Sequence, residues 1–348
     1  LSHPRLEFVC TVCEEVGMEG ATGIDVSMLK GKKLLNMDSE EEGVMLASCA
    51  GGCRADVKLP VERETVSGTK LTVSLSGLTG GHSGSEIDKG RGNANTLMSR
   101  LLRDASAPVA IASIDGGRKD NAIPRECTAQ IIVAPDEAAA VKASIEQAAA
   151  EIAEEFKASD PDLKLTVSEE TDCSESAISA KDSARVIALI EALPNGIIRM
   201  SREIDKLVET SLNLGVLKSD DAAVTLRYAV RSSVGVAKKS LKNQLVCIAG
   251  AFAAEVTFEG DYPAWEYKKD SKLREDMVRI FEEMYGKKPT VEAIHAGVEC
   301  GLLSGKIEGL DCISMGPDMY DIHTTEERLS ISSAKRSYEY ILRVIACK

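Results

Sequence analysis

The sequence predicts an α/β protein in which the chain starts in one α/β domain, enters an inserted α+β domain and then returns to the first. Short apolar runs near both ends alternate with helical periodicity, which is typical of a buried, mainly parallel sheet. The middle of the chain alternates apolar and polar residues, as strands of a half-exposed sheet do. With 348 residues and 44% hydrophobic content, the chain is large enough for about two domains.

The first part of the outer domain is predicted to span residues 1–53. The apolar run at residues 6–13 predicts a buried strand, a helical stretch is expected at residues 25–29, and residues 33–37 predict a second strand. This spacing of strand, helix and strand indicates an α/β layer. The first strand has no preceding element to pair with, so we expect the sequence to begin inside a domain.

Residues 54–260 predict the inserted domain. Two similar passes of strands and helices follow one another without a repeat of fixed period, which predicts a domain of two similar halves. The expected strands are residues 55–61, 70–75, 109–114, 127–133, 164–167, 208–216, 223–230 and 255–258, and the expected helices are residues 93–103, 135–156, 183–192 and 238–253.

The second part of the outer domain is predicted to span residues 261–348. A helix with an apolar stripe begins near Leu273 and ends at Gly286. Strands are then predicted at residues 291–295 and 312–315, and helices at residues 299–303 and 333–345.

The composition excludes several classes of function. Asp and Glu total 55 against 42 Lys and Arg, and the net charge of −13 argues against nucleic acid as a partner. The longest apolar run, Leu245–Ala254, is about half of the roughly 20 residues that a membrane-spanning helix needs. The sequence does not open with a secretory signal. We therefore expect a cytoplasmic protein without a membrane or nucleic-acid partner.

The ten cysteines are too sparse for a disulfide scaffold. Several lie in apolar stretches and are predicted to be reduced core thiols, namely Cys10, Cys127, Cys247 and Cys312. The pairs Cys10–Cys13 and Cys49–Cys53 leave open a four-thiolate zinc site. Burial as small hydrophobic side chains is favoured for the first pair, because residues three apart on a strand point to opposite faces.

Acidic residues follow both strands that are predicted near the N-terminus. Glu14 and Glu15 come after the first strand and Asp38 after the second, at the sheet edge where open α/β sheets bind ligands. Adjacent acids at such an edge can divide the work, since one can bind a metal ion while the other accepts a proton from water. A solvated turn and a helix cap are the ordinary alternatives.

Histidines are few, which limits the possible metal sites. The chain has only His3, His82, His295 and His323, without a paired-histidine motif, so a metal would need carboxylates and one or two dispersed imidazoles. His82 lies in a glycine-rich segment, Gly80–Gly84, and His323 follows the last predicted strand. Each of these histidines has an ordinary alternative as a loop residue.

Two further segments carry exposed donors. Asn121 lies in a loop that also contains Pro124 and Arg125, and Arg231 closes a predicted strand. Both positions also have ordinary loop interpretations.

Together these segments resemble the cytosolic di-metal exopeptidases related to carboxypeptidase G and aminoacylase, and more narrowly the aminoacyl-histidine dipeptidases. The resemblance implies a three-layer zinc-exopeptidase-like catalytic domain with an inserted lid domain, metal-dependent hydrolysis of Xaa-His dipeptides such as β-Ala-His, and a homodimer through the lid. The matching segments cover essentially the whole chain and comprise residues 11–21, 36–43, 49–52, 80–84, 92–95, 121–126, 208–213 and 294–301.

The resemblance also implies a role for each candidate residue. A Glu general base would activate the attacking water, and zinc, two ions per site in the family, or Mn²⁺ or Co²⁺ in its place, would be the cofactor. The implied roles are Glu14 as general base, Glu15, Asp38 and His323 as metal ligands, His82 as oxyanion stabiliser, often across a dimer interface in related enzymes, and Asn121, Arg231 and His295 near the substrate.

The sequence departs from the family pattern in two ways. The family carries an N-terminal H-x-D motif and a further Asp that bridges the two metals, and this sequence has neither. Cys13 stands in place of the usual Asp, and Thr324 and Thr325 follow His323 in place of Ser-Pro. We therefore expect an N-terminally truncated catalytic domain with about half of the ligand set, weak metal binding and little turnover by this sequence alone.

Two alternatives stay open at this point. One is a non-catalytic protein, a dimerisation or peptide-binding module on a degenerate peptidase scaffold. The other is a deacylase of N-acyl amino acids, which would use the same site with a different pocket. The metal content of the purified protein separates the first alternative from an enzyme.

Overall fold

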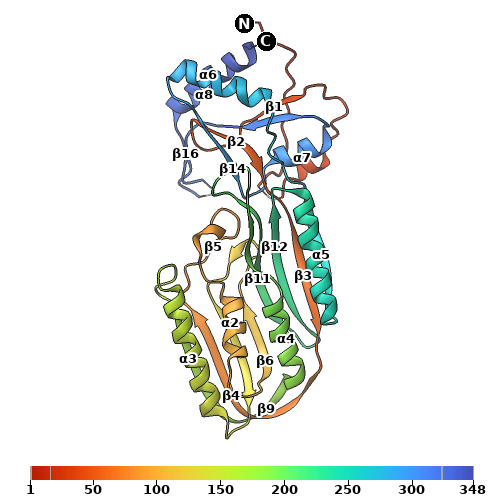
Figure 1. The fold of residues 1–348 in the computed structure, drawn as a ribbon, viewed down its shortest axis with the longest axis vertical. Helices are drawn as coiled ribbons and strands as arrows, with labels where there is room; N and C mark the ends of the chain where they lie inside the picture. Colours follow the sequence, from red (N-terminus) through yellow and green to blue (C-terminus); the bar gives the residue numbers. More distant parts are fainter. Residues whose placement is uncertain (1, 16, 323, 348) are drawn as a thin grey trace.

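The computed structural model describes residues 2–15, 17–322 and 324–347. The described chain forms two lobes that lie end to end, with both ends of the chain in the smaller lobe (Figure 1). The chain enters the larger lobe along β3 (Gly51–Pro60) and returns along β13 (Glu255–Tyr262), which pairs with β3 in antiparallel fashion. The mixed α/β architecture with an intervening second sheet agrees with the predicted fold class.

The smaller lobe contains a four-stranded sheet in the order β1-β15-β2-β14. The outer pairs, β1 with β15 and β14 with β2, are parallel, and one antiparallel contact joins β15 to β2. The strands are β1 (Lys33–Asn36), β2 (Val44–Cys49), β14 (Thr290–Ile294) and β15 (Asp311–Ser314), and the helices are α1 (Glu19–Gly23), α6 (Lys272–Tyr285), α7 (Glu299–Lys306) and α8 (Ile331–Ala346).

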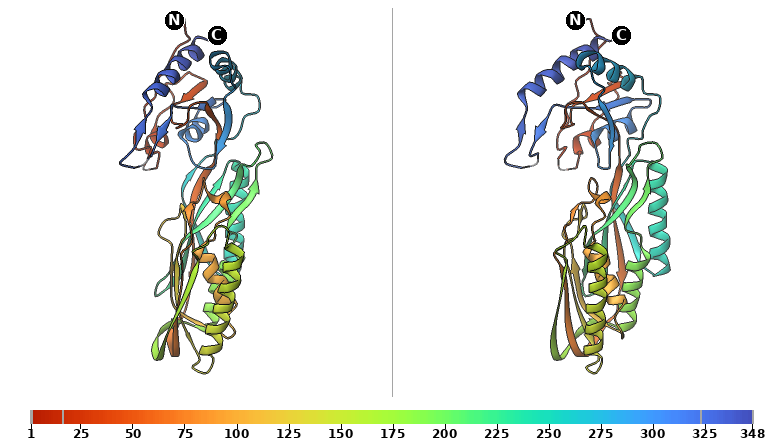
Figure 2. Two further views of the ribbon diagram at one scale, coloured as in Figure 1. Left: turned by 90° about the vertical axis from the view of Figure 1, so that its left-hand side faces the viewer. Right: turned by 60° about the vertical axis from the view of Figure 1, so that its left-hand side comes forward.

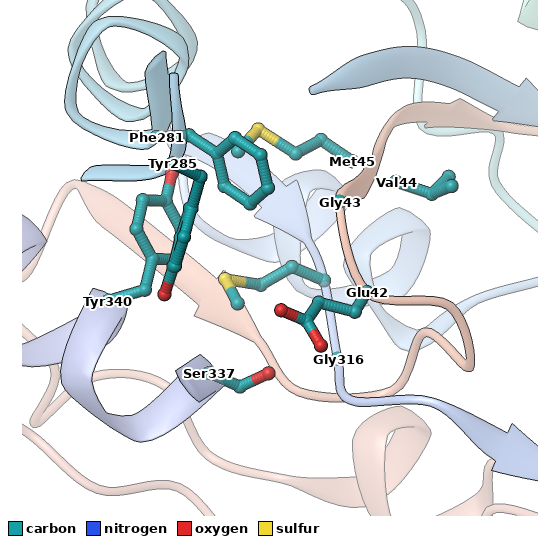
Figure 3. Close-up of a pocket in the computed structure, with 10 residues that line it drawn as sticks. Glu42, Gly43, Val44, Met45, Phe281, Tyr285, Gly316, Ser337 and Tyr340 are labelled. Carbon is teal, nitrogen blue, oxygen red and sulfur yellow. The ribbon is translucent and has the colours of Figure 1, made fainter. Parts of the chain in front are cut away.

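Helices cover both faces of this sheet because alternate side chains of each strand point to opposite faces. Met45 of β2 and Ile313 of β15 pack in one cluster with α6 and α8. Cys312 of β15 packs in a second cluster with Cys300 of α7. Figure 3 shows the aromatic side of the first cluster, where the Phe281 and Tyr340 rings meet edge to face with centroids 5.4 Å apart.

The larger lobe contains a nine-stranded sheet in the order β13-β3-β12-β11-β6-β8-β4-β9, with β10 paired to β11. Four helices lie on one face of this sheet (Figure 2). The remaining strands are β4 (Arg63–Ser76), β6 (Ala110–Gly116), β8 (Cys127–Val133), β9 (Lys164–Ile178), β10 (Gly196–Met200), β11 (Val208–Ser219) and β12 (Ala223–Ser232), and the helices are α2 (Ala94–Arg103), α3 (Ala138–Phe156), α4 (Ala180–Ala192) and α5 (Gly235–Ala251).

The alternating pattern of the larger lobe places its core on the helical face. In β4, Leu71, Val73 and Leu75 are buried and join the core that all four helices share, whereas the residues between them are partly exposed. Burial of Leu, Ile and Val side chains contributes about 1.5–3 kcal/mol each relative to exposure. The predicted half-exposed sheet is therefore confirmed for this part of the chain.

The remaining elements of the described chain are short. Two-residue strands β5 (Gly81–His82) and β7 (Ala122–Ile123) pair with each other, as do β16 (Met319–Tyr320) and β17 (Arg328–Leu329), and one 3₁₀ turn, η1, covers Ile87–Lys89. The division at residues 1–53, 54–260 and 261–348 stays a prediction, and β3 and β13 each cross one of its boundaries. No helix in the described part of the chain is long and apolar enough to cross a membrane.

The strand predicted at residues 6–13 is wrong. This segment has no regular structure, and Phe8 and Val12 are exposed by 89% and 68%. A strand forms only where a neighbour accepts its backbone hydrogen bonds, and here no strand pairs with the segment. A Glu7 carboxylate instead accepts hydrogen bonds from the backbone of Lys30 and Gly31.

The helix predicted at residues 25–29 is also wrong. The Asp25 side chain accepts a hydrogen bond from the Ser27 backbone N–H at 2.9 Å, a local turn that competes with a helix. A short helix, α1, forms six residues earlier in the chain. Strand β2 was not predicted, although Val44–Ala47 is an apolar run between glycines that is typical of a buried strand.

Candidate active site

Glu14 and Glu15 lie in a tight turn that joins the extended N-terminal segment to α1. The Glu14 carbonyl oxygen accepts backbone hydrogen bonds from Gly17 at 3.2 Å and Met18 at 2.9 Å. Cys13 and Met18 on either side have φ of 57° and 56°, in the left-handed region that side chains disfavour. Strained backbone of this kind concentrates at functional sites. The predicted position at the end of a strand is wrong, because no strand precedes this turn.

Asp38 follows β1 by two residues, as predicted. Its neighbour Ser39 contacts β15, the strand that pairs with β1, and the Ser39 hydroxyl lies 3.0 Å from the Ser314 hydroxyl. Desolvation by surrounding atoms, and then the carboxylates of Glu299 and Glu15, raise the pKa of Asp38 above its usual value. Glu15 and Asp38, which come from different segments, therefore lie within electrostatic range of each other.

Asp38, Glu15 and Glu299 form an acidic cluster, and their carboxylate groups are of a type that binds metal ions. Carboxylate oxygens are zinc ligands, and a cation between Glu15 and Asp38 would offset their repulsion. The third predicted ligand, His323, lies outside the described residues. Within residues 2–15, 17–322 and 324–347, no group of three or more His, Cys, Asp or Glu side chains is arranged to hold a metal. The metal-ligand roles of Glu15 and Asp38 therefore stay a prediction.

A thiolate site is not formed either. All ten cysteines are free, and the two predicted pairs differ in their exposure to solvent. Cys49 and Cys53 are buried in the sheets, whereas Cys10 and Cys13 are exposed because their segment is not a strand. The predicted burial of Cys10 and of Cys247 is thus wrong, whereas Cys127 and Cys312 are core thiols as expected.

A second cluster forms where the lobes meet. His82 on β5 and Arg231 on β12 belong to the larger lobe, and His295, just after β14, belongs to the smaller one. At Gly84 a Cβ atom would lie 2.5 Å from the His295 carbonyl oxygen and 2.9 Å from the His82 ring. Burial and then the charge of Arg231 lower the pKa of His82, and they lower that of His295 to about 3. The ring of His295 is therefore neutral at physiological pH.

His295 is held across the boundary between the lobes. Its Nε2 lies 2.7 Å from the Ser211 hydroxyl of β11, and its side chain is almost completely buried. The Nε of the neighbouring Arg231 is buried without a hydrogen-bond partner among the described residues. Buried polar atoms normally have partners, so Arg231 is a candidate to bind a polar group of a ligand.

Asn121 lies beside His82 through the short sheet of β5 and β7. Its backbone carbonyl accepts a hydrogen bond from Ser83 N–H at 2.9 Å, and its side chain is exposed. The buried Asn213 side chain donates to the backbone oxygens of Asp120 and Ala122, at 2.9 and 2.8 Å, and so fixes the loop on both sides of Asn121. The structure thus brings Asn121 together with His82.

The sequence did not reveal two supporting residues of this region. Asn213, described above, lies in one of the segments that carried the family resemblance. Asp160, after α3, is buried and accepts backbone hydrogen bonds from Thr79 and Gly92, both at 2.8 Å. It therefore fixes both ends of the segment that carries His82. The sequence itself shows only an acidic residue shortly after a predicted helix, a pattern that is also typical of exposed loops.

The neutral, buried state of His295 predicts an acid-dependent loss of stability. The unfolded chain binds a proton at His295 below about pH 6.5, whereas the folded protein does not until about pH 3. Stability is therefore present above the unfolded pKa and lost as the pH falls below it, at about 1.4 kcal/mol per pH unit. Urea unfolding between about pH 4 and 7 gives the free energy of unfolding of the wild type and of His295→Asn, and the wild type is expected to lose more stability as the pH falls. The same dependence of this free energy on pH in both proteins would contradict a neutral, buried His295.

Comparison with known proteins places these clusters in context. The M20 peptidase dimerisation domain matches residues 73–160. The chain is 35% identical over 335 residues to the cytosol non-specific dipeptidase of Escherichia coli (strain K12), covering 95% of this chain and 69% of that protein. It is similar to the crystal structure of aminoacylhistidine dipeptidase from Vibrio alginolyticus, with a TM-score of 0.89, 32% identity, and coverage of 96% of this chain and 69% of that one.

Proposed function

The chain belongs to the M20 peptidase family, and we propose that it hydrolyses dipeptides, with Xaa-His dipeptides as the preferred class, in a metal-dependent reaction. The observation that carries this proposal is the pair of clusters in the structure. One gathers carboxylates around Asp38, and the other gathers Arg231 with two histidines at the boundary between the lobes. Amide hydrolysis requires both an activated water and a site that binds the peptide.

The acidic cluster supports the water-activation half of the reaction. Glu15 and Asp38, with His323, are the residues that would hold zinc, which when bound polarises the peptide carbonyl and lowers the pKa of water to about 7. In the proposed reaction Glu14 accepts a proton from the attacking water and then delivers it to the leaving amine. A positioned general base of this kind contributes about 10²–10⁴-fold to a rate.

The second cluster supports substrate binding and stabilisation of the oxyanion. We assign the terminal carboxylate of the dipeptide to Arg231, whose planar guanidinium forms paired hydrogen bonds with carboxylates. His82 is assigned to the tetrahedral oxyanion, because an imidazole N–H there donates a hydrogen bond without adding a second charge beside Arg231. Asn121 is assigned to the substrate backbone, and His295 lies near the site without an assigned role.

The comparisons support the proposed class of substrate, the location in the cell and the oligomeric state. Both relatives are named as dipeptidases, and one name specifies aminoacylhistidine substrates. The cytosolic name of the other supports a cytosolic location for this protein. The match of residues 73–160 to a dimerisation domain supports a homodimer through the larger lobe.

Removal of metal is the direct test of the proposed function. The natural full-length protein is expected to hydrolyse Gly-His and β-Ala-His, to lose that activity after dialysis against a chelator, and to regain it with Zn²⁺, Mn²⁺ or Co²⁺. Release of free histidine measures the reaction. Acetyl-histidine serves as the matched substrate for deacylase chemistry. Activity that survives complete metal removal, or binding of dipeptides without hydrolysis in the metal-loaded protein, would contradict the proposal.

A further inference from the structure

Four neighbouring strands place a row of polar residues beside the proposed carboxylate site. Ser211 on β11 pairs directly with Arg231 on β12, Arg231 pairs with Gly52 on β3, and Gly52 pairs with Tyr262 on β13. Directly paired residues of antiparallel strands point to the same face of a sheet. Arg231 therefore lies between Ser211, which contacts His295, and Gly52. Tyr262 lies beyond Gly52.

Gly52 leaves the gap through which Tyr262 reaches Arg231. The Tyr262 hydroxyl oxygen accepts a hydrogen bond from Arg231 Nη1 at 3.3 Å. A Cβ atom at Gly52 would lie 2.6 Å from that hydroxyl oxygen and 2.9 Å from the ring carbon that bears it. Any side chain at position 52 would thus occupy the space of the tyrosine. The glycine is required for close approach and not for an unusual backbone angle, since its φ is not positive.

Tyr262 is fixed from its other sides. Across the boundary between the lobes, a Cβ atom at Gly297 would lie 3.0 Å from its ring, so the ring packs against that backbone. The Lys238 ammonium, which is largely buried, donates to the Tyr262 carbonyl oxygen and to Asp261. Burial raises the pKa of the Tyr262 phenol, although Arg231 opposes this shift. The ring is therefore a rigid, uncharged acceptor.

A contact at one nitrogen restricts the orientation of a guanidinium. The guanidinium has five donors in one plane, so holding Nη1 limits the directions in which the others point. The Arg231 Nε is buried without a partner among the described residues. Arg231 also lacks a carboxylate partner among the ion pairs of the described residues. We propose that Tyr262 is a positioning residue that holds the Arg231 guanidinium in the orientation that binds the terminal carboxylate of the substrate, with Gly52 as the gap that this contact requires.

This inference rests on the proposed function, and its test separates the two. In Tyr262→Phe, which removes only the hydroxyl, the KM for Gly-His is expected to rise about tenfold while kcat changes less than about twofold. The affinity for Gly-His amide, measured as a substrate or competitive inhibitor, is expected to stay unchanged, because the amide has no carboxylate for Arg231 to bind. Tyr228→Phe is the matched control, since Tyr228 is a fully buried tyrosine on β12 whose hydroxyl has no partner in the described structure.

Three kinetic outcomes would overturn the inference while leaving the proposed function intact. These are an unchanged KM in Tyr262→Phe, an equal loss for the dipeptide and its amide, and an equal effect in Tyr228→Phe. Failure of the wild type to bind or hydrolyse any dipeptide would overturn the proposed function instead. Crystal structures of the wild type and Tyr262→Phe supply a readout without substrate. The Arg231 guanidinium is expected to move in the variant, and an unmoved guanidinium would also overturn the inference.

Gly52→Ala is a second variant with the same expected signature. Its methyl group would displace the tyrosine from the other side, so the KM for Gly-His should rise at least as much as in Tyr262→Phe. Combining the two substitutions should give little further increase, because both act through one contact. Additive effects of the two substitutions on KM would contradict a shared route through Arg231.

Discussion

Glu14→Gln is expected to lower kcat for Gly-His about a thousandfold in the natural full-length protein. Glutamine has nearly the same shape, but its amide cannot accept a proton from water at neutral pH. The turn around position 14 is fixed by backbone hydrogen bonds from Gly17 and Met18, which the substitution leaves in place. The loss is therefore expected in kcat, with a small change in KM. Initial rates of histidine release over a range of substrate concentrations measure both quantities.

Glu41→Gln is the matched control for this prediction. Glu41 is an exposed acid in the run that follows Asp38, so the same chemical change there should leave kcat within about twofold. Bound zinc should remain in Glu14→Gln, because Glu14 is assigned as a base and not as a ligand. Retained turnover would remove Glu14 from its role, and loss of zinc together with turnover would reassign it to the metal centre.

Arg231→Gln is expected to raise the KM for dipeptides about a hundredfold. The substitution removes the charge-assisted, paired hydrogen bonds to the terminal carboxylate, and a hundredfold corresponds to about 2.8 kcal/mol. The loss should shrink to less than about threefold for the dipeptide amide. Steady-state kinetics with Gly-His and its amide measure the difference between the two substrates.

Arg227→Gln is the control for the charge itself. Arg227 lies on the same strand, β12, four residues before Arg231, but its guanidinium forms a paired ion pair with Asp56 at 2.8 and 2.7 Å. Its substitution changes the net charge by the same amount without touching the cluster at the boundary between the lobes. An equal rise of KM in both variants would point to a general electrostatic effect and against a specific carboxylate site.

The fold was predictable where the pattern of side chains reports burial directly. The alternation in Lys70–Leu75 and the apolar stripe of α6 each follow from one face meeting a core, and both elements are confirmed. The N-terminal segment has an equally apolar pattern, yet a strand also needs a partner for its backbone, and sequence periodicity carries no information on the partner. This difference explains why residues 6–13 were assigned wrongly.

The candidate site was predictable in its residue types and only partly in its geometry. The resemblance pointed to His82, Arg231 and His295, and the structure brings these three together. The role of Tyr262 depends on the register that aligns Arg231, Gly52 and Tyr262 across three strands. Residues that meet through such a row lie far apart in sequence, and a one-residue change of register would separate them.

The location of bound zinc tests the central claim most directly. Crystals of the natural full-length protein grown with Zn²⁺, measured above and below the zinc absorption edge, reveal zinc by its anomalous signal. We expect a zinc peak within about 2.0–2.2 Å of carboxylate oxygens of Glu15 and Asp38, with the His323 imidazole as a further ligand. Zinc bound elsewhere, or no zinc peak near Glu15 and Asp38 in crystals of an active preparation, would contradict the account.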